Sequence, residues 1–198
     1  MHDALISTGP KLTIRPASAE DAGAVQAIYA PIVADTSISF EYEPPSVDEM
    51  ALRIQRTLER LPWLVAEEAG EVVGYAYASQ HAERAAYAWS VDTSVYVAAG
   101  WHGKRVGRTL YDELFSALIS LGYVSAYAGI TLPNVASIAL HEASGYVPIG
   151  VFPAVGYKFR QWHDVGWWHR VLRAQPDEPE PPRAYVEPQP PTSRTLAS

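Results

Sequence analysis

Apolar and polar positions recur along the chain with two periods, and the changes between them mark the expected elements. Apolar residues spaced three or four apart follow a serine cap at Ser18 and another at Ser46, and recur from Arg105 to Leu121. Elsewhere, apolar and polar residues alternate and β-branched and aromatic residues are frequent, which predicts strands. We expect helices near residues 18–32, 46–59, 105–121 and 133–145, and strands near residues 12–15, 63–68, 71–79, 87–97, 124–131, 147–152 and 156–172.

These elements predict a single domain of the α+β class, with α/β features, in which helices flank the sheet. Residues 1–10 form an expected flexible leader, and residues 11–173 form the domain. From Ala174 onward the chain is rich in proline and poor in apolar residues, so we expect residues 174–198 to be a disordered tail.

Composition narrows the classes of partner. Lys and Arg number 15 against 22 Asp and Glu, a net charge of −7, which disfavours nucleic acid and anionic membranes as partners and favours a small molecule. Cysteine is absent, which removes disulfides, thiolate metal sites and cysteine-linked intermediates. With no export signal or membrane-length apolar run, we expect a cytoplasmic location, and we expect no metal.

A basic loop between the 87–97 strand and the following helix is the first candidate site. It reads HGKRVGR from His102 to Arg108, and a loop of this kind before a helix start is typical of an anion site. It matches neither the Walker loop nor the three-glycine dinucleotide pattern. On this pattern alone, an ordinary basic turn is the alternative.

Polar residues share one face of the 133–145 helix. Asn134, Ser137, Ile138 and His141 follow the spacing i, i+3, i+4, i+7, which favours a shared ligand. Two plain alternatives stay open, namely that Asn134 only caps the helix and that His141 is a buried, hydrogen-bonded histidine.

Asp92 interrupts an apolar strand just before the basic loop. Val91, Thr93, Val95 and Val97 share one strand face, so Asp92 belongs to the other face, with Ser94 and Tyr96. A carboxylate at such a position lies either on a half-exposed edge or in a pocket where it works as a base.

Four stretches together resemble the GNAT acyl-CoA-dependent N-acyltransferases, and within them the phosphinothricin acetyltransferase branch, which includes methionine sulfone and sulfoximine acyltransferases. They are TSISFEYEP, ERLPWLVAEEAGEVVGYAYAS, YAWSVDTSVYV, and LPNVASIALHEASGYVPIG followed by GYKFRQWHDVGWW. The resemblance implies a GNAT fold of order βααβββαβαβ, with a mostly antiparallel central sheet that is splayed between the strand ending at Val97 and the next strand, where the thioester arm enters. It also implies a homodimer.

The resemblance further implies roles for individual residues. Acetyl-CoA would be bound by Val95, Tyr96, Val97, His102, Gly103, Lys104, Arg105, Val106, Gly107, Arg108, Asn134 and Ser137. Asp92, with His141, would deprotonate the substrate amine, and the substrate pocket would contain Phe40, Arg84, Tyr157 and Lys158.

Two positions depart from the family pattern. Arg105 replaces a glycine, and Asp92 replaces a glutamate, which shortens the acidic side chain by one C–C bond, about 1.5 Å. The shorter arm favours a water between Asp92 and the amine.

The expected activity is acetyl transfer from acetyl-CoA to the α-amine of a small amino-acid analogue. The alternatives are a protein N-terminal or small-amine acetyltransferase and a non-catalytic acyl-CoA sensor.

Overall fold

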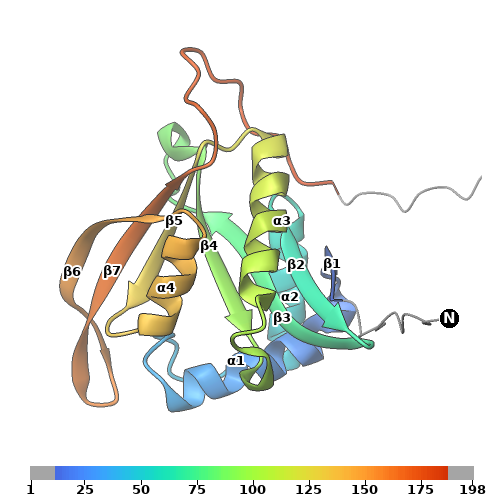
Figure 1. Cartoon of the computed structure of the whole chain (residues 1–198), viewed down its shortest axis with the longest axis vertical. Coiled ribbons are helices and arrows are strands. Elements are labelled where there is room, and N and C mark those ends of the chain that lie inside the picture. The colour runs from blue at the N-terminus through green and yellow to red at the C-terminus, as the bar shows by residue number, and fades with distance from the viewer. Residues whose placement is uncertain (1–11, 187–198) are drawn as a thin grey trace, which may run out of the picture.

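The computed structural model describes residues 12–186 (Figure 1). The expected leader at residues 1–10 and the part of the expected tail at residues 187–198 lie outside these described residues. The helices are α1 (Ala22–Asp35), α2 (Val47–Leu58), α3 (Val106–Leu121) and α4 (Val135–Ala143), with short 3-10 turns η1 (Ala19–Asp21), η2 (Ala85–Tyr87) and η3 (Ala99–Trp101). The strands are β1 (Thr13–Pro16), β2 (Trp63–Glu68), β3 (Glu71–Gln80), β4 (Ser90–Val97), β5 (Ser125–Thr131), β6 (Val147–Lys158) and β7 (Gln161–Val171).

The strands form one seven-stranded sheet in the order β1-β2-β3-β4-β5-β7-β6. Every neighbouring pair is antiparallel except β4 and β5, which run parallel. The expected mostly antiparallel sheet flanked by helices is therefore confirmed, with β7 as one strand more than the βααβββαβαβ order. Within residues 12–186, no helix has the length and apolar character needed to cross a membrane.

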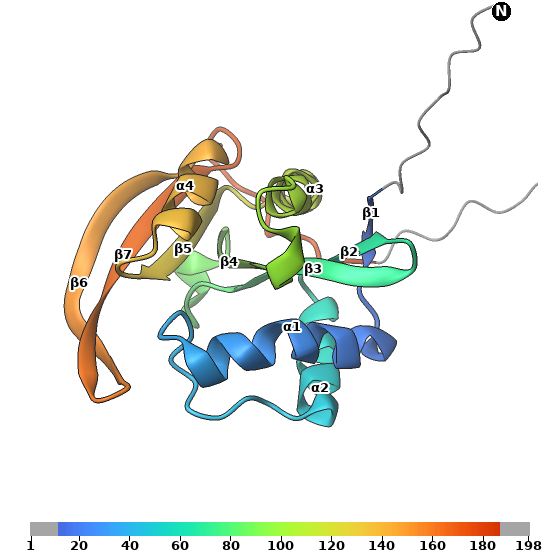
Figure 2. The same ribbon diagram turned by 60° about the horizontal axis from the view of Figure 1, so that its bottom comes forward.

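Two apolar cores lie on the two faces of the sheet. Figure 2 shows α1 and α2 on one face and α3 and α4 on the other. The α3 stripe, including Leu110, Leu114 and Leu118, is fully buried against β2, β3 and β4. Val25 of α1 and Ile54 of α2 are buried against the opposite face. The helical periods in the sequence therefore correspond to the faces that pack on the sheet.

Local signals in the sequence account for several element ends. Ala69 and Gly70 both have positive φ, 53° and 84°, as a tight hairpin turn requires, and they join β2 to β3. The hydroxyl of Ser46 accepts a hydrogen bond from the amide of Glu49 at 3.1 Å and caps α2. The hairpin and the cap both agree with the sequence prediction.

The strand expected from Tyr87 begins later, at Ser90. Residues 85–87 form η2 instead, because alanine-rich sequence favours a helical turn over a strand. The preceding loop also turns there, so that β4 can enter the sheet beside β3.

Residues 174–186, which we call the C-terminal strap, pack on the domain and differ from the expected disordered tail. The amide of Arg183 donates to Leu121 O at 2.8 Å and that of Tyr185 to Arg60 O at 3.0 Å, while the Tyr185 ring packs against the α3 core. The Trp89 indole donates to Glu180 O at 2.8 Å. Backbone hydrogen bonds and one aromatic ring thus hold a segment that is poor in apolar residues.

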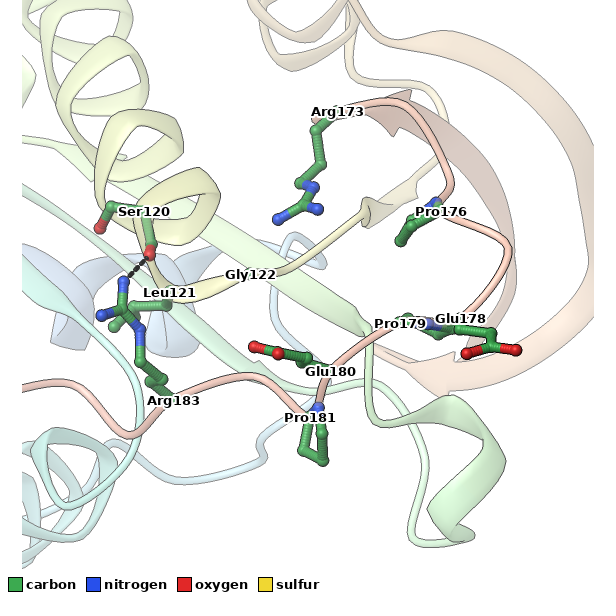
Figure 3. Close-up of a pocket in the computed structure, with 10 residues that line it drawn as sticks. All are labelled: Ser120, Leu121, Gly122, Arg173, Pro176, Glu178, Pro179, Glu180, Pro181 and Arg183. Carbon is green, nitrogen blue, oxygen red and sulfur yellow. Dashed lines mark hydrogen bonds between the residues drawn. The ribbon is translucent and has the colours of Figure 1, made fainter.

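The strap and the end of α3 surround a pocket, shown in Figure 3. Its lining includes Gly122, Arg173 and Glu180, and the Arg183 guanidinium donates to Ser120 O. Because α3 has 16 residues, this pocket lies about 24 Å along the helix from the basic loop. It is therefore separate from the candidate site.

Candidate active site

The sheet opens between β4 and β5. The two strands pair over only three positions, Ser90 to Asp92 against Ser125 to Tyr127, whereas β4 stays paired with β3 as far as Val97. Asp92 and Tyr127 are the last pair before the strands diverge. This splay leaves one backbone edge of β4 without a strand partner beyond Asp92.

Backbone direction along β4 decides which residues face the splay. The amide of Ala98 donates to Val73 O beside β3, and backbone groups of successive strand residues point in opposite directions. The backbone groups of Val95 and Val97 therefore point into the splay, whereas those of Tyr96 point toward β3. The Val97 carbonyl already accepts from His102 Nε2 at 2.9 Å, which leaves its N–H for a ligand.

Asp92 lies half-buried at the narrow end of the splay. Its Oδ1 is 2.7 Å from Nδ1 of His81, a residue just beyond the end of β3. Burial raises the pKa of Asp92 above its ordinary value, while the hydrogen bond to His81 opposes the shift. Burial in this way brings the pKa of a carboxyl closer to the range useful for a base.

Sequence reasoning missed His81, which was assigned only to a connecting loop. Its ring stacks on Tyr127 with centroids 4.5 Å apart, and Tyr127 stacks in turn on His169 at 4.8 Å. The signal that would have found it is the β3–β4 register, in which Ser79 lies opposite Asp92. Nine residues separate Gln80 from Ser90, and this long connection hides that register in the sequence.

The structure does not bring His141 to Asp92, although both were assigned to proton transfer. His141 is buried on the α3 side of the sheet, whereas Asp92 belongs to the β4 face that turns toward α1 and α2. Its Nδ1–H donates to Ser137 O at 2.8 Å, and Nε2 accepts from the Tyr111 hydroxyl at 2.8 Å. Burial lowers the pKa of His141, so the plain alternative of a satisfied, neutral histidine fits this geometry.

The basic loop presents backbone amides at the start of α3. Arg105 occupies the N-cap position without a side-chain cap, and the first amide to find a helical acceptor is that of Thr109, on Arg105 O. The amides of Val106, Gly107 and Arg108 are therefore open at the positive end of the helix. Gly103 and Arg105 both have positive φ, 75° and 65°. These two residues turn the loop sharply just before α3 begins.

The cations of the loop point in different directions. Lys104 Nζ lies 4.1 Å from the centroid of the Trp101 ring, at the loop surface. Arg108 instead donates to Asp112 at 3.0 Å and to the Ala143 carbonyl at the end of α4. The guanidinium of Arg108 is thus bonded to Asp112 and Ala143, whereas its backbone N–H is one of the open amides.

Asn134 caps α4 across the splay from β4. Its side-chain oxygen accepts from the amide of Ser137 at 3.1 Å, as the capping alternative predicted. The cap uses the oxygen only, so the Asn134 amide nitrogen has no partner among residues 12–186. Ser137 Oγ lies 3.3 Å from His141 Nδ1.

Two of the expected substrate residues, Phe40 and Tyr157, lie where the β6–β7 hairpin meets the loop at residues 36–45. Phe40 packs so closely on Gly156 that a Cβ there would overlap its ring. The Tyr157 carbonyl accepts from the Tyr42 hydroxyl at 2.7 Å. Arg84 is exposed just before η2, and no ion pair holds it within the described residues.

The side chain of Lys158 is buried and makes contacts that the sequence did not predict. It is 2% exposed, and its Nζ donates to Val33 O at 2.6 Å and to Ser39 O at 2.7 Å. Burial lowers the pKa of this ammonium. Lys158 therefore ties the hairpin to the end of α1 and the following loop.

Comparison with known proteins places this geometry in a family. The sequence matches the family model for an acetyltransferase (GNAT) domain over residues 14–167. It is 41% identical over 170 residues to a phosphinothricin N-acetyltransferase of Streptomyces viridochromogenes, covering 86% of this chain and 91% of the relative. It is 34% identical over 169 residues to an L-methionine sulfoximine/L-methionine sulfone acetyltransferase of Salmonella typhimurium, covering 84% and 99%.

A solved structure agrees with the sequence relatives. The phosphinothricin acetyltransferase of Sinorhizobium meliloti in complex with acetyl-CoA superposes with a TM-score of 0.80 at 34% identity. The match covers 89% of this chain and 99% of that chain.

Proposed function

The chain belongs to the GNAT acetyltransferase family, and from this premise we propose that it acetylates the α-amine of a small amino-acid analogue, using acetyl-CoA. Phosphinothricin, methionine sulfoximine and methionine sulfone are the proposed substrate types, since relatives are named for them. The observation that supports the proposal most directly is the splay after Asp92, with a half-buried carboxylate at its narrow end.

The residues present fit acetyl-CoA. The open amides of Val106 and Gly107, with Lys104 and Arg105 beside them, suit a pyrophosphate. The backbone groups of Val95 and the N–H of Val97 suit the amide groups of a pantetheine arm. Asn134 and Ser137 form the opposite wall. Acetyl-CoA supplies the activated acyl group, and the Val97 N–H is our candidate donor to the acyl oxygen as negative charge develops there.

We propose that Asp92 is the carboxylate that promotes loss of the proton from the substrate amine. An amino-acid amine arrives as an ammonium, which is not nucleophilic until it is deprotonated. Burial raises the pKa of Asp92, which strengthens it as a base. We leave His141 out of this step because both of its ring nitrogens are already bonded on the other side of the sheet.

Arg84 is the proposed partner for the anionic or sulfone-like end of the substrate. Its exposed guanidinium belongs to the loop that follows His81. Arg84 is therefore close in sequence to His81, the hydrogen-bond partner of Asp92. The planar fork of an arginine suits two oxygens on one acid group. Phe40 and Tyr157 would cover the apolar part of the same substrate.

We also propose a homodimer formed through the β6–β7 hairpin. Large apolar side chains are exposed along it, among them Phe152 at 54%, Phe159 at 56% and Trp162 at 62%. Exposed apolar surface of this kind is typical of an interface. Because Tyr157 belongs to the same hairpin, a partner seated there would cover the entrance of the substrate site.

Release of coenzyme A, measured over an amine panel, tests the function. We expect turnover with phosphinothricin, methionine sulfoximine or methionine sulfone, and little with peptide N-termini. Turnover confined to peptides would replace our substrate with protein N-termini. Binding of acetyl-CoA without turnover on any amine would instead identify a sensor. Sedimentation of the wild type and of Trp162→Glu tests the dimer, which we expect the variant to dissociate.

A further inference from the structure

His81 and Asp92 form a hydrogen-bonded pair at the narrow end of the splay between β4 and β5. Building on the proposed acetyl transfer, we infer that His81 Nε2 is the atom that takes the proton from the amine. Asp92 then acts as a positioning residue that holds the imidazole. This assignment refines the proposed role of Asp92: the proton leaves the amine toward the Asp92–His81 pair, and His81 Nε2 receives it.

The position of the pair supports this assignment. Asp92 is the last residue of β4 to pair with β5, and its partner there is Tyr127. His81 stacks on that same Tyr127, with an angle of 21° between the rings. The imidazole is therefore fixed at the apex of the splay, where the two strands diverge.

Neighbouring rings restrict the imidazole on its other sides. Tyr87 contacts it edge-on at 5.9 Å between centroids, and Trp167 does so at 6.4 Å. The side chain of His81 is 25% exposed, so part of the ring still reaches the outside. A ring that is packed on several sides and open on one can present a single atom to a ligand.

The hydrogen bond to Asp92 selects the tautomer. A carboxylate can only accept, so the proton of the neutral imidazole lies on Nδ1, which is 2.7 Å from Asp92 Oδ1. Nε2 then carries the lone pair. No group among residues 12–186 hydrogen-bonds Nε2, in contrast to the fully bonded ring of His141.

One base is sufficient for the proposed acetyl transfer. His81 Nε2 takes one proton from the ammonium, and the freed nitrogen lone pair forms the C–N bond to the acyl carbon. The C–S bond breaks, the sulfur leaves with its electron pair, and the second nitrogen proton passes to it to give the thiol. The imidazolium, stabilised by the Asp92 carboxylate, then releases its proton to water.

The decisive experiment is chemical rescue of His81→Ala. We expect this variant to bind acetyl-CoA with a dissociation constant close to the wild-type value and to lose about a hundredfold or more in kcat. Added imidazoles should restore turnover, and the rescued rate should rise with the pKa of the added imidazole. A purely structural histidine would show no such dependence. His81→Gln keeps an N–H that can donate to Asp92. It serves as the second variant in case the alanine substitution destabilises the protein.

Two further variants sharpen the result. Asp92→Asn should lower kcat without rescue by imidazole, because the base is still present but no longer oriented. His169→Gln is the matched control in the same aromatic stack, and we expect it to stay within about threefold of wild type. Full activity of His81→Ala or of His81→Gln, or a folded His81→Ala that imidazoles do not rescue, would overturn the assignment.

A pH profile separates the two possible bases. The titratable groups that face His81 are Asp92 on β4, Tyr87 on η2 and Tyr127 on β5, with His169 of β7 beyond Tyr127. We expect the dependence of kcat/KM on pH in the wild type to be altered in His81→Gln, whose side chain has no basic nitrogen. A wild type that acetylates no amine contradicts the proposed function, whereas an active wild type with an unchanged profile in His81→Gln contradicts only the inference.

Discussion

Replacing Lys158 with methionine tests whether this residue is a structural tie or a substrate ligand. Its buried ammonium donates to Val33 O and Ser39 O, at 2.6 and 2.7 Å. Hydrogen bonds to a charged group each contribute about 1.5–3 kcal/mol, and the variant leaves both carbonyls without this donor. Relief of the cost of burying a charge offsets part of the loss, so we expect a net loss of about 3 kcal/mol in unfolding free energy.

Thermal unfolding followed by circular dichroism measures this loss. For a domain of this size, about 3 kcal/mol lowers the midpoint by roughly 6–12 °C. Lys104→Met removes an exposed lysine and serves as the control, with an expected change of no more than about 2 °C. Since Ser39 lies next to Phe40, the KM for the amine should also rise. An unchanged midpoint together with a raised amine KM would refute the tie and restore Lys158 as a substrate ligand.

Three further predictions concern the two loops and the hairpin. Lys104→Ala combined with Arg105→Ala should raise the KM for acetyl-CoA several-fold at low salt, and the difference from wild type should shrink as salt is added. Gly156→Ala should displace the Phe40 ring and raise the KM for the amine with little effect on that for acetyl-CoA. Hydrogen bonds from Arg53 hold the pKa of Glu41 below its ordinary value, a stabilisation present above that value and lost as pH falls through the folded pKa. Glu41→Gln should therefore lower the unfolding midpoint at pH 7, and by less near pH 3.

Periodicity and caps were sufficient to predict most elements of the fold. The α3 stripe, the Ser46 cap and the Ala69–Gly70 turn are local signals, and each appears in the structure as the sequence indicates. The strap was not predictable because its main anchors are backbone hydrogen bonds to Leu121 and Arg60, which composition does not report.

The site was predicted less completely because it depends on contacts between distant segments. Helical spacing correctly put Asn134 and His141 on one face, but it could not show that this face lies across the sheet from Asp92. The partner of Asp92, His81, is 11 residues away along the chain and meets it only through the strand register. The resemblance implied that Lys158 lies in the substrate pocket, whereas its hydrogen bonds join it to Val33 of α1 and to Ser39 of the following loop, 125 and 119 residues away along the chain.

The short β4–β5 pairing has a consequence for the dynamics of catalysis. Only three residue pairs join the two halves of the sheet, so the free protein lacks main-chain bonds that a continuous sheet would have. A pantetheine arm lying beside Val95 and Val97 would supply them, and would act as a temporary strand. Amide hydrogen exchange at these two residues should then be fast in the free protein and slow in the complex. Acetyl-CoA would in this way stiffen the sheet before the amine arrives, which favours an ordered addition of the two substrates.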